Sequence, residues 1–279
     1  MDGGSIYELG MAYGLGCRCY AFTRDLREMR FKYQGSQIRG QQVYDQKGRP
    51  LPYADLPFSP NILGACKLVE GDFDDALHLM SLDITEERKR GQYPRKQVPI
   101  QSLPAQHARP AVYLAGPERW DADAAEQYAE MKRLCAHYGL DAVTPLDGTL
   151  PNEGADRYAK AFQTFENNQH HIQQCDVVLA NLNDFHGWEP DSDTAFECGL
   201  GYILGKKLYG YMDNNCKMID RVPNFGEARE FRDQCGCNVE NFDYPINCMF
   251  AGSMPILGGS FEQVLKEVVE DLKKQEVLK

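Results

Sequence analysis

The sequence predicts an α/β fold in which helices cover both faces of a parallel sheet, and two observations support this. Short apolar runs alternate with longer segments of helical periodicity between residues 110 and 279. Glycine and proline residues separate these segments, as they commonly do where strands and helices meet. Such alternation is typical of a doubly wound sheet whose strands all run in one direction.

The strands are predicted from apolar runs that are bounded by turn residues. The first run, Ala111-Val-Tyr-Leu-Ala115, ends at Gly116-Pro117. The others cover residues 141–145, 176–182 and 207–211. The run at 176–182 has the continuous apolar character of a strand that is buried on both faces.

The helices are predicted from apolar residues that recur every three or four positions. They cover residues 121–138, 156–174, 194–204 and 261–272. Gly205 ends the third helix, because glycine readily adopts the left-handed conformation that follows a helix. The predicted class is therefore a flavodoxin-like or Rossmann-like sheet, which binds ligands at the carboxyl ends of its strands, where strand order reverses.

The beginning of the chain resembles a later part of it. Residues 2–16 match residues 191–205 without a gap, and Glu8 falls on Glu197. With small gaps, the similarity continues to about residue 90. An internal repeat of this kind predicts two copies of one structural unit.

Three parts follow from this repeat: a partial copy over residues 1–90, a linker over residues 91–109 and a complete domain over residues 110–279. The linker is charged and interrupted by prolines. The partial copy lacks counterparts of the first strands. A sheet without them exposes an edge and a face. We therefore expect a truncated reading frame or a remnant in preference to a half-domain that borrows surface from elsewhere.

Composition excludes several classes of function. The formal net charge is -11, which disfavours binding to the phosphates of a nucleic-acid polymer. The sequence has neither an apolar run long enough to span a bilayer nor the pattern of a signal peptide, so we expect a cytoplasmic protein. Its ten cysteines lack the spacing of a zinc ribbon. We predict reduced thiols, no metal and no cofactor.

The segment from Asp191 to Glu197 has two interpretations. Thr194 and Glu197 have the spacing of a capping box, in which the glutamate only caps its own helix. Alternatively, Glu197 is a nucleophile, since a helix N-terminus favours an anion. Tyr113 on the first strand is then either part of the core or the group that orients this carboxylate.

Four motifs in order resemble the nucleoside 2-deoxyribosyltransferase family over residues 111 to about 275. They are Tyr-x-Ala-Gly-Pro at 113–117, Cys-Asp-x-Val-x-Ala-x-Leu at 175–182, Glu-Pro-Asp-x-x-Thr-Ala-Phe-Glu-x-Gly at 189–199 and Pro-x-Asn-x-Met at 245–249. The resemblance implies that Glu197 is the nucleophile, that Asp191 handles the proton of the nucleobase and that Tyr113 orients Glu197.

The resemblance also implies a set of substrate-binding residues. Asn168 reads the base at a position where some members carry aspartate, so it departs from their pattern. Trp120 lines the base pocket after the turn, where the small residues leave space for a ligand: Ala115, Gly116 and Pro117. Asn247 corresponds to an asparagine that a neighbouring subunit donates; without the resemblance it would be a turn cap.

The implied activity is transfer of 2-deoxyribose between nucleobases through a covalent deoxyribosyl-glutamate, a step of nucleoside salvage. Its small-molecule partners are 2′-deoxynucleosides and free bases. We expect a homo-oligomer, or else a first copy that supplies the subunit contact within the chain, with Asn61 near the pocket. The alternatives are an N-glycosidase of 2′-deoxynucleoside 5′-monophosphates and an inactive nucleotide-binding module.

Overall fold

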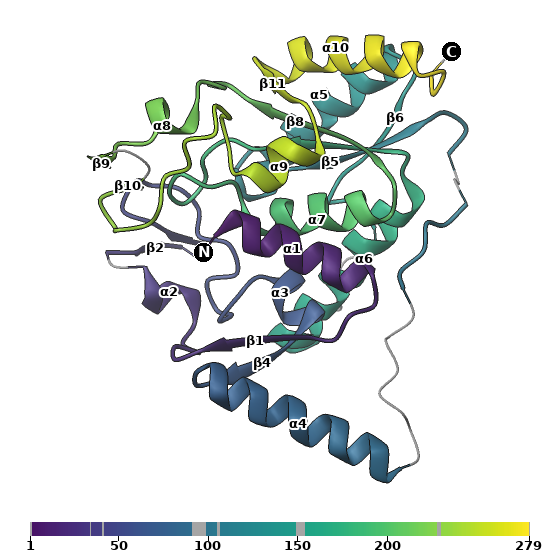
Figure 1. The fold of residues 1–279 in the computed structure, drawn as a ribbon. Helices are drawn as coiled ribbons and strands as arrows, with labels where there is room; N and C mark the ends of the chain where they lie inside the picture. The colour runs from purple at the N-terminus through teal and green to yellow at the C-terminus, as the bar shows by residue number, and fades with distance from the viewer. Residues whose placement is uncertain are drawn as a thin grey trace.

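A parallel five-stranded sheet lies at the centre of the computed structural model, which describes residues 2–33, 35–40, 42–90, 99–104, 107–148, 154–227 and 230–278 (Figure 1). In chain order its strands are β5 (Ala111–Ala115), β6 (Asp141–Val143), β7 (Val177–Asn181), β8 (Lys207–Met212) and β11 (Ile256–Gly258). Their spatial order is β11-β8-β7-β5-β6, and every neighbouring pair is parallel. Strand order therefore reverses between β5 and β7, which is where such sheets bind ligands.

Helices cover both faces of this sheet. In Figure 1, α5 (Ala124–His137) and α10 (Phe261–Lys274) lie on one side, and α6 (Arg157–Gln174) and α7 (Ser192–Ile203) lie on the other. Alternate residues of β5 enter two separate cores, because successive strand side chains point to opposite faces. Val112 and Leu114 pack in the core beneath α5 and α10, whereas Tyr113 packs in the core beneath α6 and α7. The predicted doubly wound α/β fold is confirmed.

Several short elements of this region were not predicted. They are α8 (Met218–Arg221), the hairpin of β9 (Phe225–Glu227) and β10 (Glu230–Arg232), α9 (Cys248–Ser253) and the edge strand β11. Each has between three and six residues. Such lengths are too short for hydrophobic periodicity to distinguish a strand from a helix or a turn.

Residues 3–89, called the N-terminal segment below, form a smaller set of elements. They are α1 (Gly3–Gly14), β1 (Cys19–Thr23), α2 (Met29–Lys32), β2 (Gln37–Arg39), β3 (Gln42–Tyr44), α3 (Pro60–Ala65), β4 (Cys66–Glu70) and α4 (Phe73–Lys89). β1 and β4 form a separate parallel pair. The elements from α7 to α10 follow one another in the same order: helix, strand, short helix, hairpin, short helix, strand and long helix.

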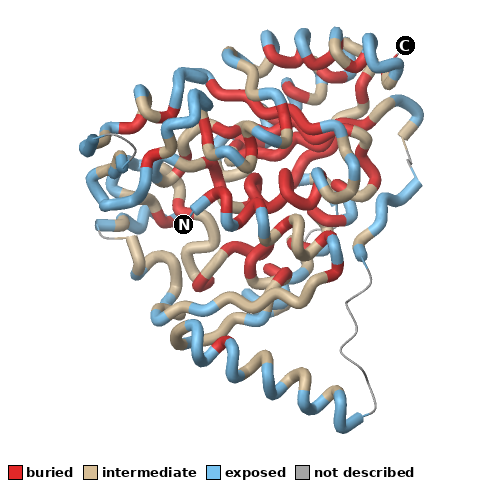
Figure 2. The backbone as a smooth tube through the Cα atoms, in the orientation of Figure 1, coloured by how far each residue is buried: buried red, intermediate tan, exposed pale blue. Residues whose placement is uncertain are grey.

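The N-terminal segment is joined to the main sheet through the packing of α1 against α7. Both helices lie in the buried centre of the molecule, whereas α4 lies at its exposed edge (Figure 2). Gly10 on α1 faces the carbonyl oxygen of Phe196, and Gly199 on α7 faces that of Tyr7; a Cβ atom at either glycine would overlap the facing oxygen. Two glycines, one on each helix, therefore allow the two backbones to approach closely.

The expected linker is only partly within the described residues, since 91–98 and 105–106 lie outside them. Within the described part, the Ile100 amide donates to the Gly14 carbonyl at 2.9 Å, and the Leu103 amide donates to the Gln173 carbonyl at 3.0 Å. These contacts place residues 100–103 along the ends of α1 and α6. Across the described ranges, none of the helices combines the length and the apolar character that a bilayer span requires.

Candidate active site

Glu197 lies in the second turn of α7, and its side chain is held by two neighbouring elements. Its Oε1 accepts a hydrogen bond from the Tyr113 hydroxyl of β5 at 2.8 Å and another from Nδ2 of Asn168 on α6 at 3.0 Å. All three residues are buried, with Glu197 only 2% exposed. The structure thus brings together three residues that are far apart in the sequence.

The start of α7 is capped by Asp191 and not by Thr194. The helix begins at Ser192, and the Asp191 carboxylate accepts hydrogen bonds from the amide and the hydroxyl of Thr194, both at 3.2 Å. The alternative in which Glu197 and Thr194 form a capping box is therefore wrong. Since Asp191 caps the helix, the Glu197 carboxyl group is left to bond with Tyr113 and Asn168 instead.

Three acidic side chains are buried together in this region: Asp191, Asp193 and Glu197. Burial raises the pKa of Glu197 to about 8, and Asp193 contributes to the rise. Burial and the neighbouring Asp193 likewise raise the pKa of Asp191 to about 7. Burial also raises the pKa of Asp193. Low dielectric and like charges both favour protonated acids, so the cluster can hold protons at neutral pH.

Arg119 supplies a positive charge beside these acids. It follows Gly116 on a single 3-10 turn of residues Pro117–Trp120, and its Nη1 is shielded from solvent. Burial opposes its charge, yet Asp193 and Glu197 are among the neighbours that hold the pKa of Arg119 above its ordinary value. Its guanidinium carbon lies 4.9 Å from the centre of the Trp120 ring. Arg119 therefore favours the ionised form of at least one neighbouring acid.

Glu118 links the turn after β5 to the neighbouring strands β7 and β8. Its Oε1 accepts hydrogen bonds from Nδ2 of Asn181 at 2.7 Å and from the Tyr211 hydroxyl at 3.0 Å. A Cβ atom at Gly116 would overlap the Glu118 carboxylate, so this position requires glycine for space. The predicted residues Ala115, Gly116, Pro117 and Trp120 consequently form one turn at the carboxyl end of β5.

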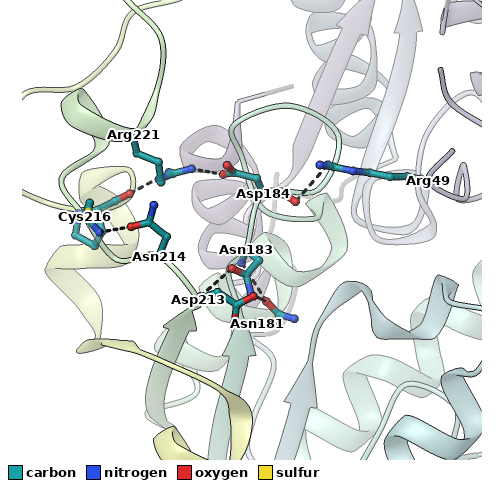
Figure 3. Close-up of polar contacts among 9 residues, drawn as sticks. Arg49, Asn181, Asn183, Asp184, Asp213, Asn214, Cys216 and Arg221 are labelled. Atoms are coloured by element: carbon teal, nitrogen blue, oxygen red, sulfur yellow. Dashed lines mark hydrogen bonds and ion pairs between the residues drawn. The ribbon is translucent and has the colours of Figure 1, made fainter. Parts of the chain in front are cut away.

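The turn after β7 is held by a network of polar contacts (Figure 3). Asn181 Oδ1 accepts hydrogen bonds from the amide and Nδ2 of Asn183, at 3.0 and 2.9 Å. Arg221 pairs with the Asp184 carboxylate, and Arg49 donates to the Asp184 carbonyl at 3.3 Å. Because Arg49 belongs to the N-terminal segment, that segment helps to fix the loop that leads into α7.

Asn247 is not part of this group of residues. It caps α9, where its Oδ1 accepts a hydrogen bond from the Met249 amide at 2.9 Å and its Nδ2 donates to Glu240 at 2.7 Å. It lies against Gly4 at the start of α1. The asparagine that does reach the cluster is Asn61, whose Nδ2 donates to the Asp193 carbonyl at 3.4 Å.

Asp193, Tyr53 and Ser59 are further residues of the site that the sequence did not single out. Tyr53 and Ser59 belong to the N-terminal segment, and with Asp191 and Asp193 they line a cavity of about 90 Å³. The hydroxyls of Ser59 and Tyr53 lie beside the Asp193 carboxyl group, and as hydrogen-bond donors they lower its pKa against the burial that raises it. Within the described residues, these buried polar atoms have no hydrogen-bond partner: Arg119 Nη1, Trp120 Nε1 and Asn168 Oδ1. Buried polar groups are normally paired, so this concentration indicates a site for a polar ligand.

Glu197→Gln is expected to stabilise the protein at high pH but not at low pH. The carboxyl group has a pKa of 4.5 in its ordinary state and about 8 in the folded protein, so folding takes up a proton between these values. The free energy of unfolding therefore falls as pH rises through this range. Glutamine has no proton to lose. At pH 8 the variant should gain on the order of a few kcal/mol, which corresponds to several degrees in melting temperature.

Thermal unfolding followed by circular dichroism checks this prediction at pH 8 and pH 4.5. The difference between the variant and the wild type should disappear at the lower pH, where both side chains are neutral. A difference of the same size at both pH values would contradict the raised pKa of Glu197.

Comparison with known proteins agrees with this geometry. The family model of nucleoside 2-deoxyribosyltransferase matches residues 112–249. An uncharacterised protein of Schizosaccharomyces pombe is 26% identical over 193 residues, which cover 60% of this chain and 90% of that protein. The family match includes β5, α6, β7 and α7, and with them Tyr113, Asn168, Asp191 and Glu197.

Two solved structures are also similar to this chain. A 2-deoxyribosyltransferase from Leishmania mexicana has 27% identity and a TM-score of 0.46, and the match covers 58% of this chain and 97% of that one. A 2-deoxyribosyltransferase from Bacillus psychrosaccharolyticus has 21% identity and a TM-score of 0.37, with 55% and 89% covered. Residues 112–249, just under half of the chain, are therefore similar to the nucleoside 2-deoxyribosyltransferase family.

Proposed function

We propose that the protein transfers 2-deoxyribose between nucleobases by double displacement, with Glu197 as the nucleophile. The observation that carries this proposal is the pair of hydrogen bonds from Tyr113 and Asn168, which both end on Oε1 of Glu197. They orient the carboxyl group and leave Oε2 as the oxygen that bonds to carbon. A nucleophile held by a second polar group is the arrangement that covalent catalysis requires.

In the first step, Oε2 of Glu197 attacks C1′ of the deoxynucleoside while the bond from C1′ to the base nitrogen breaks. The electron pair of that bond goes to the base, which leaves well only if a ring nitrogen gains a proton. Asp191 is the proposed donor, since its raised pKa of about 7 keeps part of it protonated near neutral pH. A second base then attacks C1′ through a ring nitrogen, gives that nitrogen's proton to Asp191, releases Glu197 and restores the original configuration.

A sugar that lacks a 2′-hydroxyl is well suited to this double displacement. Loss of the electron-withdrawing 2′-oxygen makes the oxocarbenium-like transition state easier to reach. Arg119 lies close enough to Glu197 and Asp193 to influence their charge. Its charge favours the carboxylate form of Glu197, which the attack needs, against the desolvation that opposes it.

A base-exchange assay tests the proposal. Purified protein is incubated with one 2′-deoxynucleoside and a different free base, and the exchanged nucleoside is measured by chromatography. Parallel reactions with the 5′-monophosphate as donor and water as acceptor separate the transferase from a nucleotide N-glycosidase. Hydrolysis of the monophosphate without exchange would favour the glycosidase, and binding without any product would favour an inactive binding module.

Tyr113→Phe is expected to move the acidic limb of the pH–rate profile to higher pH. The Tyr113 hydroxyl lowers the pKa of Glu197, so its loss should raise that pKa further above its ordinary value. Loss of one hydrogen bond to a charged group corresponds to about 1.5–3 kcal/mol, or roughly a 10- to 100-fold lower kcat/KM at neutral pH.

The measurement is kcat/KM for exchange between pH 5 and pH 9. Tyr209→Phe is the matched control, because Tyr209 is also a buried strand tyrosine but bonds to Asp271 at 2.5 Å. The control should keep the wild-type profile. An unchanged profile in Tyr113→Phe would show that this hydroxyl does not act on the nucleophile.

A further inference from the structure

Tyr53 is a residue of the N-terminal segment whose side chain faces the acidic cluster. Its hydroxyl is buried beside the Asp193 carboxyl group, whose pKa it lowers as a hydrogen-bond donor against the burial that raises it. Burial raises the pKa of the Tyr53 phenol well above its ordinary value; Asp193, Asp191 and Glu197 add to the rise, and Arg119 opposes it. The phenol therefore stays neutral and keeps a proton to donate.

The backbone of Tyr53 holds an unusual conformation. Its φ angle is 46°, in the left-handed region that side-chain-bearing residues rarely adopt. The turn is closed by a hydrogen bond from the Leu56 amide to the Tyr53 carbonyl at 2.8 Å. Conformations of this kind persist where the surrounding structure enforces them, and they concentrate at functional sites.

The ring of Tyr53 meets the side chain that is expected to line the base pocket. Its centroid lies 4.6 Å from that of Trp120, with the two planes at 81°. An edge-to-face pair of this kind fixes the direction of both rings. The hydroxyl of Tyr53, beside Asp193, and the unpaired Nε1 of Trp120 are thus two buried donors that come from opposite halves of the chain.

The segment that carries Tyr53 is anchored on both sides of the site. Asn61 donates to the carbonyl of Asp193, and His186 contacts Asp45 at 3.1 Å and the Pro50 carbonyl at 3.0 Å. α3 packs on α6, where Gly64 lies directly against the ring of Phe165. Together with the packing of α1 on α7, these contacts hold the segment against the loop that carries Asp191.

We propose that the N-terminal segment completes the active site within a single chain, and that Tyr53 recognises the nucleobase by donating a hydrogen bond from its phenol to a ring or carbonyl acceptor. The substrate class rests on the proposed function. The N-terminal segment then supplies, within the same chain, a side chain that faces the acidic cluster. Tyr53 is accordingly a specificity-determining residue.

Tyr53→Phe tests the contact while keeping the ring against Trp120. We expect KM for the deoxynucleoside to rise about tenfold with kcat within about threefold of wild type, because one hydrogen bond to the bound base is lost. Calorimetric titration with the same deoxynucleoside should show a matching loss of affinity. Tyr44→Phe, on β3 of the same segment and outside the cavity, should change neither value.

These readouts separate the two proposals. If the wild type exchanges bases and Tyr53→Phe leaves KM unchanged, only the proposed role of Tyr53 is overturned. If the wild type binds the deoxynucleoside but makes no exchanged nucleoside, and Tyr53→Phe weakens that binding, only the proposed transferase activity is overturned. A wild type that neither binds nor exchanges would overturn both.

A complementation experiment tests whether the site is completed within one chain. Tyr53→Ala and Glu197→Gln variants carry different tags, are co-expressed and are purified through both tags or as a mixture. If one chain provides both residues, no combination restores exchange. Restored activity would show that Tyr53 of one molecule serves Glu197 of another. Circular dichroism of each variant confirms that it is folded.

Discussion

Replacing Glu197 by glutamine is expected to remove base exchange almost completely, by a factor on the order of 10³ to 10⁶ in kcat, as loss of a nucleophile does in other covalent enzymes. Glutamine preserves an oxygen that accepts hydrogen bonds from Tyr113 and Asn168, so the geometry of the site is kept. Its amide cannot form the ester to C1′. The loss should therefore lie in kcat, with substrate binding largely retained.

The matched control for this experiment is Glu8→Gln. Glu8 occupies the corresponding position on α1, but its side chain is exposed. We expect it to leave exchange unchanged, since no strand-one tyrosine stands beside it. The measurement is the initial rate of exchanged nucleoside at saturating substrate. If the activity of Glu197→Gln is within tenfold of that of the wild type, Glu197 is not the nucleophile.

Replacing Gly199 by alanine is expected to have the largest effect on stability. The added methyl group would overlap the Tyr7 carbonyl oxygen, which belongs to a helix backbone and cannot rotate away. Overpacking in a well-packed core commonly costs 1–3 kcal/mol, and contact with backbone places this site at about 3 kcal/mol or more. The melting temperature should fall by on the order of 10 °C.

Gly252→Ala is the control for helix propensity. Gly252 lies in α9 and has no neighbouring atom within 4 Å of a Cβ position, so alanine there should be neutral or slightly stabilising. Thermal unfolding of both variants gives the comparison. If Gly199→Ala melts at the wild-type temperature, the close approach of α1 and α7 is not required for stability.

The main sheet could be predicted because its strands are continuous apolar runs and its helices are long enough to show periodicity. The segment at 176–182 is an example: β7 is buried along Val177–Ala180, as its composition indicates. β11 could not be predicted in the same way. It has three residues, and its identity as a strand comes from pairing with β8, a contact that local sequence does not encode.

Glu197, its two hydrogen-bonding partners and Asp191 could be named in advance, whereas Asp193, Arg119 and Tyr53 could not. Asp193 has an ordinary explanation as an acidic residue in the first turn of a helix. Arg119 points inward only because a 3-10 turn directs it there. Tyr53 lies in an irregular stretch and enters the site through tertiary packing alone. Asn247 is expected from the sequence to serve the pocket of a neighbouring subunit; in this chain it caps α9 and lies against Gly4 at the start of α1.

Because α1 is covalently continuous with α7, their docking is a first-order event. Two separate molecules would need a protein concentration above their dissociation constant to form such a contact, whereas a tethered pair is present at an effective concentration set by the connecting chain. The melting temperature conferred by this contact should then be insensitive to dilution, unlike that of an obligate dimer. A segment tethered in this way would reach its packed position on α7 without having to meet a second molecule.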